Sequence, residues 1–192
     1  MTSGGGIILA SASPRRVELM TLAGIPFEAV PADICEDMLI GEKPEEHVSR
    51  LSSEKATAVS EKTDGRFFIG ADTVVVLDGM VMGKPSDSEE AVRMLKALSG
   101  RGHQVLTGVT VYDRKTSVSM SETVSTEVFF KSLGETEIER YVASGCPMDK
   151  AGAYAMQGGA AHFVRSINGS YTNVIGLPMT ELYIILREME AI

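Results

Sequence analysis

Apolar residues in this chain occur in short uninterrupted runs and in longer stretches where they recur every three or four positions. Uninterrupted runs bounded by turn residues are typical of buried strands, and the wider spacing is typical of helices. The runs predict strands at residues 7–11 and 27–31, and the spacing predicts a helix over residues 45–62. Five residues lie at the helical spacing in that stretch: Val48, Leu51, Lys55, Ala58 and Val59.

Capping and turn residues mark the boundaries of further elements. Ser13 can cap a helix that begins at Pro14 and ends at Gly24. "RFFIGAD" predicts a strand, and the apolar run after it contains Asp78-Gly79, a pair that favours a tight β-hairpin. "SDSEEAVRMLKALSG" begins with capping residues and ends in glycine, so it predicts another helix.

The second half of the chain contains longer β-rich runs. Residues 103–113 and 118–130 surround "DRKTS" and predict a long hairpin, followed by a helix near residues 135–143. "FVRSI" predicts a short strand, and "LPMTELYIILREME" predicts a closing helix. Because strands and helices alternate, we expect one α/β domain with a mixed sheet, in two lobes. Residues 1–6 are expected to be a flexible start.

Composition narrows the classes of function. The chain has 192 residues, 44% of them apolar, and a net charge of −8, which argues against a protein that coats nucleic acid with a basic face. A few clustered cations can still bind a small anion, because charges more than about 10 Å away are largely screened. No apolar stretch is long enough to span a membrane, and "MTSGGG" lacks the basic region of a secretory signal. Cys35 and Cys146 have no metal-ligand spacing, so reduced thiols in a cytoplasmic protein are expected.

The first stretch with candidate chemistry is "SASPRR", which contains Ser13, Arg15 and Arg16. A helix N-terminus presents free N–H groups and partial positive charge, and it binds phosphate readily. Two guanidinium groups at that place add bidentate donors. A capped surface helix with two solvated arginines is the alternative.

The second stretch is "GADTVV", in which Asp72 directly follows an apolar run and two small residues. That is the place where α/β sheets hold ligands, and a carboxylate there can bind Mg²⁺ or take a proton from water. An Asx-turn that closes the strand is the alternative. In "ADICED", Asp33, Glu36 and Asp37 offer a carboxylate that could share a metal with Asp72, although such loops are often only solvated surface.

Two further stretches contain polar residues of interest. "GKPSD" resembles a phosphate-binding P-loop, but Gly79 is one residue too close and Pro85 replaces the required Ser or Thr. Lys84 can still bind a phosphate as a point charge, or it can be a solvated lysine. "DKAGAYAMQGGAAHFV" is either a packed turn of small residues or a loop in which the amide of Gln157 contacts the edge of a base.

Taken in order, these stretches resemble the Maf family of nucleoside triphosphate pyrophosphatases across nearly the whole chain. The landmarks that carry the resemblance are "SASPRR", "DICE", "SSEKA", "GADTVV", "GKPSD", "LSGRGHQVLTGV", "DKAGAYAMQG" and "GSYTNVIGLP". The resemblance implies a single Maf/ITPase-like domain over residues 1–192, with a mixed central sheet flanked by helices and two lobes around a cleft. It implies hydrolysis between the α and β phosphates with a divalent metal cation, Mg²⁺ or Mn²⁺, and a homodimer.

The resemblance also implies roles for individual residues. Asp72 matches the catalytic position, and Glu36 with Asp72 matches the metal position. The substrate-binding positions are Ser13, Arg16, Lys55 and Lys84. The positions that separate subgroups by base are Arg15, Thr73 and Gln157.

"GADT" together with "QG" resembles the subgroup that acts on dTTP and UTP. The subgroup that acts on 7-methyl-GTP typically carries glutamate where Gln157 stands. Cys35 stands where many relatives carry a carboxylate, which weakens any mechanism that needs a third acid in that loop. Modified pyrimidine nucleotides are expected substrates too, because thymine already carries a 5-methyl group.

The chemistry of phosphoanhydride hydrolysis agrees with these roles. The reaction needs cations on the phosphates, a bridging metal and a carboxylate that orients water. Arg16 is expected to hold the triphosphate, and Arg15 is expected to lie closer to the base or sugar. The alternatives are a pyrophosphatase for 7-methyl-GTP or another base, and a non-catalytic nucleotide-binding regulator of septum formation. Charges gathered at one site favour an enzyme over a regulator, because they cost desolvation free energy.

Overall fold

The computed structural model describes residues 6–192 and confirms the predicted α/β class. The strands are β1 (Ile7–Leu9), β2 (Glu28–Ala29), β3 (Phe67–Leu77), β4 (Met80–Met82), β5 (Gly102–Asp113), β6 (Val118–Phe130) and β7 (Val164–Asn168). The helices are α1 (Pro14–Leu22), α2 (Pro44–Ser60), α3 (Ser88–Leu98), α4 (Glu135–Ala143), α5 (Tyr171–Ile175) and α6 (Met179–Glu188). All but Gly6 of the predicted flexible start lies outside the described residues.

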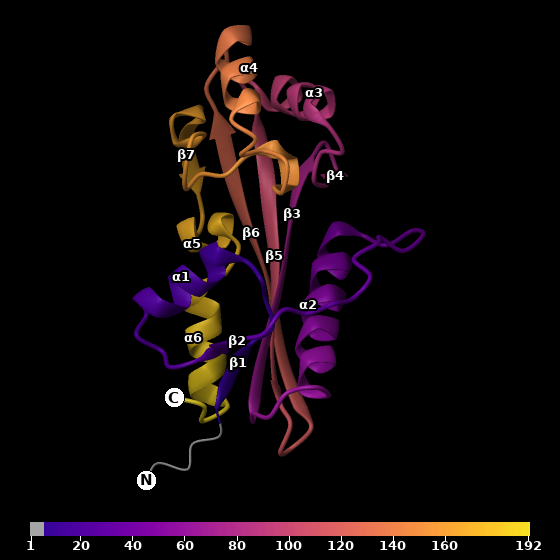
Figure 1. The fold of residues 1–192 in the computed structure, drawn as a ribbon, viewed down its shortest axis with the longest axis vertical. Coiled ribbons are helices and arrows are strands. Elements are labelled where there is room, and N and C mark those ends of the chain that lie inside the picture. Colours follow the sequence, from indigo (N-terminus) through magenta and orange to yellow (C-terminus); the bar gives the residue numbers. More distant parts are fainter. Residues whose placement is uncertain (1–5) are drawn as a thin grey trace. The chain divides into compact units, whose positions relative to one another are not determined.

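The described strands form one mixed sheet in the order β2-β1-β3-β5-β6-β7, with β4 paired to β3 (Figure 1). Strand β1 runs parallel to β2 and β3, with Leu9 opposite Ala29 and Ile69. Strand β4 is antiparallel to β3, and β7 is antiparallel to β6. No helix in the described part of the chain has both the length and the apolar character needed to cross a membrane.

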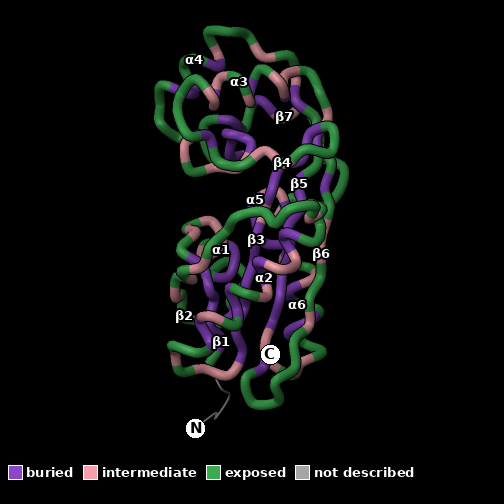
Figure 2. The backbone as a smooth tube through the Cα atoms, turned by 90° about the vertical axis from the view of Figure 1, so that its right-hand side faces the viewer, coloured by how far each residue is buried: buried purple, intermediate pink, exposed green. Residues whose placement is uncertain are grey.

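The chain folds into two compact units, in agreement with the two lobes predicted from the sequence. The first contains the described residues up to Asp72, together with Thr107–Val124 and Gly176–Ile192. The second contains Thr73–Leu106 and Ser125–Ile175. In the first unit α1 and α6 lie on one side of the sheet and α2 on the other, and Figure 2 shows β1 and β3 as its buried centre.

Most element boundaries agree with the sequence pattern. Helix α1 begins at Pro14 after Ser13, although the Ser13 hydroxyl makes no capping hydrogen bond. Asp78 and Gly79 both have positive φ, 52° and 77°, as a tight hairpin between β3 and β4 requires. The pattern missed α5 and two short 3₁₀ turns, η1 (Ala151–Ala153) and η2 (Ala161–Phe163). These pieces are too short to show a helical period.

The expectation that Asp72 follows the end of a strand is wrong. Strand β3 has 11 residues and continues through Asp72 to Leu77, so the alternative of an Asx-turn is also wrong. The reason is local, because the residues after Asp72 are Thr73 and three valines, whose β-branched side chains favour extended backbone. Asp72 therefore lies in the interior of a strand that belongs to the central sheet.

Helix α2 packs unusually close to two strands of the first unit. A Cβ atom added at Gly70 of β3 would lie 1.9 Å from the carbonyl oxygen of Ser52. One added at Gly108 of β5 would lie 2.2 Å from the carbonyl oxygen of Val48, one turn earlier in the same helix. Both strands thus lack a side chain where the helix backbone crosses them, and this allows the close approach.

Gly70→Ala should destabilise the first unit, because the new methyl group overlaps backbone that cannot rotate away. We expect a loss of about 1–3 kcal/mol or more in the free energy of unfolding. Urea denaturation measures it. Gly83→Ala is the matched control, because a Cβ at Gly83 would meet nothing within 4 Å. Equal midpoints for the two variants would contradict the close packing of α2.

Candidate active site

Lys55 and Asp72 form a buried ion pair in the first unit. The Nζ atom of Lys55 lies 2.6 Å from Oδ1 of Asp72, and their side chains are 8% and 11% exposed. The pair follows from the packing of α2, because Gly70 and Asp72 alternate to the same face of β3 and Ser52 lies three residues before Lys55. The close contact between the backbone of Gly70 and that of Ser52, one helical turn before Lys55, therefore brings the predicted residues Lys55 and Asp72 together.

Glu36 approaches the same ammonium group from an irregular segment. Its Oε1 atom lies 2.6 Å from Nζ of Lys55, and its side chain is 46% exposed. One lysine thus holds two carboxylates, a buried one and a half-exposed one. Such a cluster costs desolvation free energy and contributes little net stability, so it is better explained by a ligand than by the fold.

Arg16, in the first turn of α1, contacts the backbone beside this cluster. Its Nε atom donates to the carbonyl oxygen of Gly176 at 2.7 Å, and Nη1 donates to the carbonyl oxygen of Ala71 at 2.8 Å. Burial lowers the pKa of the Arg16 guanidinium, the charge of Asp72 opposes that shift, Arg15 adds to it and Glu36 opposes it. The group stays charged, because an arginine pKa lies far above neutral pH. Arg16 therefore fixes the backbone beside Asp72 and contributes positive charge to the cluster.

The first unit therefore brings together five of the predicted site residues, which are Arg15, Arg16, Glu36, Lys55 and Asp72. Ser13 precedes them at the start of α1, and its backbone N–H donates to the Ser11 hydroxyl at 3.1 Å. Asp33 and Asp37 are exposed, and Asp37 accepts a hydrogen bond from the Cys35 thiol at 3.2 Å. Both cysteines are free thiols, as expected.

Thr73, Lys84 and Gln157 belong to the second unit. Thr73 is the neighbour of Asp72 in β3, so its side chain points to the opposite face of the strand. Lys84 is exposed and follows β4. The side-chain oxygen of Gln157 is buried and has no hydrogen-bond partner among the described residues. A buried acceptor without a partner costs about 1–3 kcal/mol, so this oxygen is available to a donor from water or from a ligand.

Three aromatic or imidazole side chains support the loop that carries Gln157. Tyr154 bonds through its hydroxyl to Nε2 of His103 at 2.7 Å, and the backbone N–H of Ala155 donates to the Tyr141 hydroxyl at 3.2 Å. Burial raises the pKa of Tyr154, and burial lowers the pKa of His103 to about 4. Both groups are therefore neutral near pH 7, and the loop is held by buried neutral hydrogen bonds.

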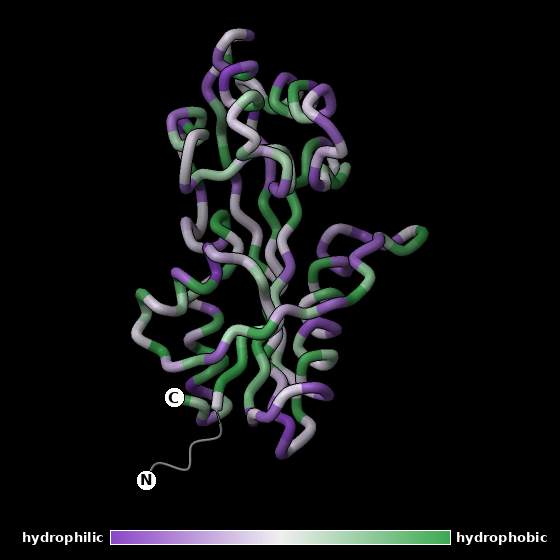
Figure 3. Tube along the Cα trace, in the orientation of Figure 1, coloured by the Kyte–Doolittle hydropathy of each residue, from purple (hydrophilic) through white to green (hydrophobic). Residues whose placement is uncertain are grey.

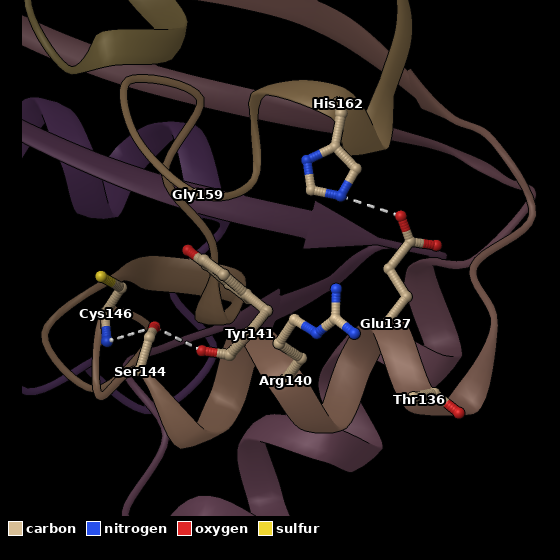
Figure 4. A pocket seen from close by; sticks show the side chains of 8 residues that line it. All are labelled: Thr136, Glu137, Arg140, Tyr141, Ser144, Cys146, Gly159 and His162. Atoms are coloured by element: carbon tan, nitrogen blue, oxygen red, sulfur yellow. Dashed lines mark hydrogen bonds and ion pairs between the residues drawn. The ribbon is translucent and has the colours of Figure 1, made fainter.

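The second unit also has a pocket of about 550 Å³ beside α4 (Figure 4). None of the predicted site residues lines it. His162 and Glu137 point toward each other on its wall, with Nε2 and Oε1 2.9 Å apart. The pocket shares Tyr141 with the support of the Gln157 loop, but it offers none of the cationic and acidic residues of the Lys55 cluster.

The Lys55 cluster can contribute to a metal site but not complete one. Within residues 6–192, no group of three or more His, Cys, Asp or Glu side chains is placed to hold a metal ion. Mg²⁺ commonly binds one or two carboxylates together with water and substrate phosphates. The convergence of Asp72 and Glu36 on one ammonium fits that pattern, with phosphate oxygens as the remaining ligands.

Sequence patterns missed the residues that support the site. Arg50 bonds to Glu42 and to the backbone of Asp37, and His103 bonds to Tyr154 across 51 positions of sequence. Of these contacts of Arg50 and His103, the sequence alone indicates one at most. Arg50 and Glu54 stand four residues apart on one helix, a spacing that favours an ion pair.

Comparison with known proteins adds an independent observation. A family profile described as Maf-like protein matches residues 6–189. A dTTP/UTP pyrophosphatase from Geobacter sp. (strain M21) is 59% identical over 186 residues, which is 97% of this chain and 96% of that protein. A dTTP/UTP pyrophosphatase from Geotalea uraniireducens (strain Rf4) is 56% identical over 192 residues, which is 100% of this chain and 99% of that protein.

Among solved structures, the Staphylococcus aureus Ham1 protein is similar in fold, with a TM-score of 0.50 and 16% identity. The similarity covers 96% of this chain and 99% of that one. At this level of identity, the similarity concerns the fold alone.

His103 should make the protein less stable in acid. The unfolded chain binds a proton at His103 below about pH 6.5, whereas the folded protein binds one only near pH 4. Stability is therefore lost as the pH falls from 6.5 to 4, by up to about 3 kcal/mol. His103→Gln should lose less stability than the wild type over that range in urea denaturation. Parallel curves for the two proteins would contradict the neutral buried state of His103.

Proposed function

This chain belongs to the Maf family, and we propose that it hydrolyses dTTP and UTP to the nucleoside monophosphate and pyrophosphate. The relatives that bear this activity in their names match nearly the full length of the chain. The observation in the structure that supports the proposal most directly is the buried Lys55–Asp72 pair with Glu36 on the same ammonium.

Asp72 is proposed as the general base. Lys55 engages Oδ1, so Oδ2 can orient a water molecule and accept its proton. The oxygen of that water forms a bond to the α phosphorus, and the bond from the α phosphorus to the oxygen between the α and β phosphates breaks. Pyrophosphate leaves with that bridging oxygen, and the water oxygen stays on the nucleoside monophosphate. Because Asp72 lies within a paired strand and is bonded to a buried lysine, its carboxylate is held in place before the substrate arrives.

The cations of the cluster are proposed to neutralise the triphosphate. Lys55 and Arg16 supply charge in the first unit, and the backbone bonds of Arg16 hold its guanidinium in a fixed orientation. Ser13 at the start of α1 and the exposed Lys84 are proposed as further phosphate contacts. A divalent cation, Mg²⁺ or Mn²⁺, held by Asp72 and Glu36 would withdraw charge from the phosphate oxygens.

Gln157 is proposed to select the base. Thymine and uracil present an N3–H donor between two carbonyl acceptors, and the buried unpartnered oxygen of Gln157 is suited to accept that N–H. Thr73 and Arg15 are proposed as further specificity positions, with Arg15 closer to the base or sugar. The homodimer and the cytoplasmic location stay predictions.

The reaction is tested by pyrophosphate release from dTTP, UTP, CTP, GTP and 7-methyl-GTP, with Mg²⁺ or Mn²⁺ and with EDTA. We expect metal-dependent release from dTTP and UTP, and at least a hundredfold loss in Asp72→Asn. Circular dichroism at the assay temperature checks that the variant is folded, because the loss of the Asp72 charge also weakens the buried pair with Lys55. Release from another base would keep the enzyme and overturn the proposed substrates. No release from any nucleotide would favour a non-catalytic binding protein.

Gln157→Glu tests the base selection. A carboxylate can accept the N3–H but cannot donate to the neighbouring carbonyl, so we expect kcat/KM for UTP to fall by about 10–200-fold, equivalent to about 1–3 kcal/mol. Gln104→Glu, at an exposed position of the same unit, is the matched control. An unchanged kcat/KM in Gln157→Glu would remove this residue from the proposed contact with the base.

A further inference from the structure

The segment that carries Glu36 has little packing of its own to hold it. Residues 30–39, between β2 and α2, form no helix or strand, and most of them are exposed. The tip of the segment is hydrophobic, as Figure 3 shows, yet Met38, Leu39 and Ile40 are 42%, 57% and 108% exposed. Val30 and Ala32 pack against the core at the start of the segment, but Glu36 lies beyond them among exposed residues. The position of Glu36 therefore depends mainly on polar contacts.

Arg50 on α2 supplies those contacts. Its Nε and Nη2 atoms donate to the two carboxylate oxygens of Glu42, at 2.6 and 2.8 Å. Nη2 also donates to the carbonyl oxygen of Asp37 at 3.1 Å, one residue after Glu36. Glu42 in turn accepts the backbone N–H of Leu39 at 3.0 Å. The Arg50 guanidinium thus holds the segment at Asp37, next to Glu36, and at Glu42, after the hydrophobic tip.

The Arg50–Glu42 contact has the features of a strong ion pair. Both side chains are largely covered, at 22% and 7% exposed, and the paired geometry is the strong two-bond form of an arginine–carboxylate contact. The Arg50 guanidinium holds the pKa of Glu42 well below its usual range, and Nδ1 of His47 lies 3.0 Å from the same carboxylate. Local helix spacing does not create this contact, since Glu42 precedes α2.

We propose that Arg50 is a positioning residue that acts through Glu36. Helix α2 holds the segment at two points, the backbone of Asp37 through Arg50 and the side chain of Glu36 through Lys55. Loss of the first point leaves Glu36 on a loose segment, so its carboxylate spends less time beside Asp72. The inference rests on the proposed function in that the affected step is the binding of metal with triphosphate.

Arg50→Met should weaken binding of a UTP analogue that has a methylene bridge between the α and β phosphates. In calorimetry at subsaturating Mn²⁺ we expect about a tenfold loss of affinity, which higher Mn²⁺ recovers in part. Arg66→Met is the matched control, because Arg66 makes a similar two-bond contact with Asp113 at 3.1 and 2.9 Å. Arg66 lies directly before β3 and six positions before Asp72, roughly 20 Å away at the rise of an extended chain, so its removal should leave the affinity unchanged.

A double-mutant cycle separates positioning from a merely structural role. If Arg50 acts through Glu36, then Glu36→Gln alone, Arg50→Met alone and the double variant should all lose about tenfold. Multiplied losses, near a hundredfold in the double variant, would overturn the proposal, as would an equal loss in Arg66→Met.

Hydrogen exchange gives a readout that does not depend on the proposed function. The amide of Leu39 should exchange faster in Arg50→Met than in the wild type or in Arg66→Met, because its acceptor Glu42 loses two of its hydrogen bonds and keeps the contact with His47. Unchanged exchange would overturn the proposal. If the wild type neither binds the analogue nor releases pyrophosphate, the proposed function fails, while the exchange result still decides whether Arg50 holds the segment.

Discussion

Helix α2 lies so close to the sheet of the first unit that a methyl group on either of two strands would overlap its backbone. That approach is possible because Gly70 and Gly108 leave bare backbone where the helix crosses β3 and β5. It sets the distance over which Lys55 must reach Asp72, and the two atoms meet at 2.6 Å. The geometry of the candidate active site therefore depends on the absence of two side chains as much as on the presence of its charges.

The charges themselves are arranged at a cost to the fold. A buried lysine that binds two carboxylates, beside a partly buried arginine, requires desolvation that the contacts only roughly offset. Such an arrangement becomes useful when a ligand carries several negative charges and approaches with a metal ion. The same principle applies to Gln157, whose buried oxygen lacks a partner within the described residues. Both features are understandable as binding sites and difficult to explain as structural devices.

Support for the site comes from residues that are distant in sequence. Arg50 holds the Glu36 segment through backbone as well as side-chain atoms, and Arg16 holds two backbone carbonyls, those of Ala71 and Gly176. Backbone acceptors carry no mark in the sequence, because every residue has one. This explains why the charged groups of the site could be predicted while the groups that orient them could not. The error at Asp72 has a different, local cause: the glycine and alanine before it suggested a strand end, which the following β-branched residues prevent.

The α/β class, most helices and strands, the hairpin at Asp78-Gly79, the family resemblance and the charged residues of the site could all be predicted from the amino-acid sequence. These follow from local periodicity, from turn chemistry and from ordered motifs, all of which are written along the chain. Packing in three dimensions is what lets Lys55 hold both Asp72 and Glu36, and what lets Arg50 hold the segment between β2 and α2 that carries Glu36. Those contacts join residues up to 19 positions apart, and they form only when packing brings α2 onto bare strand backbone. Distances of that kind depend on the whole core, which no local pattern records.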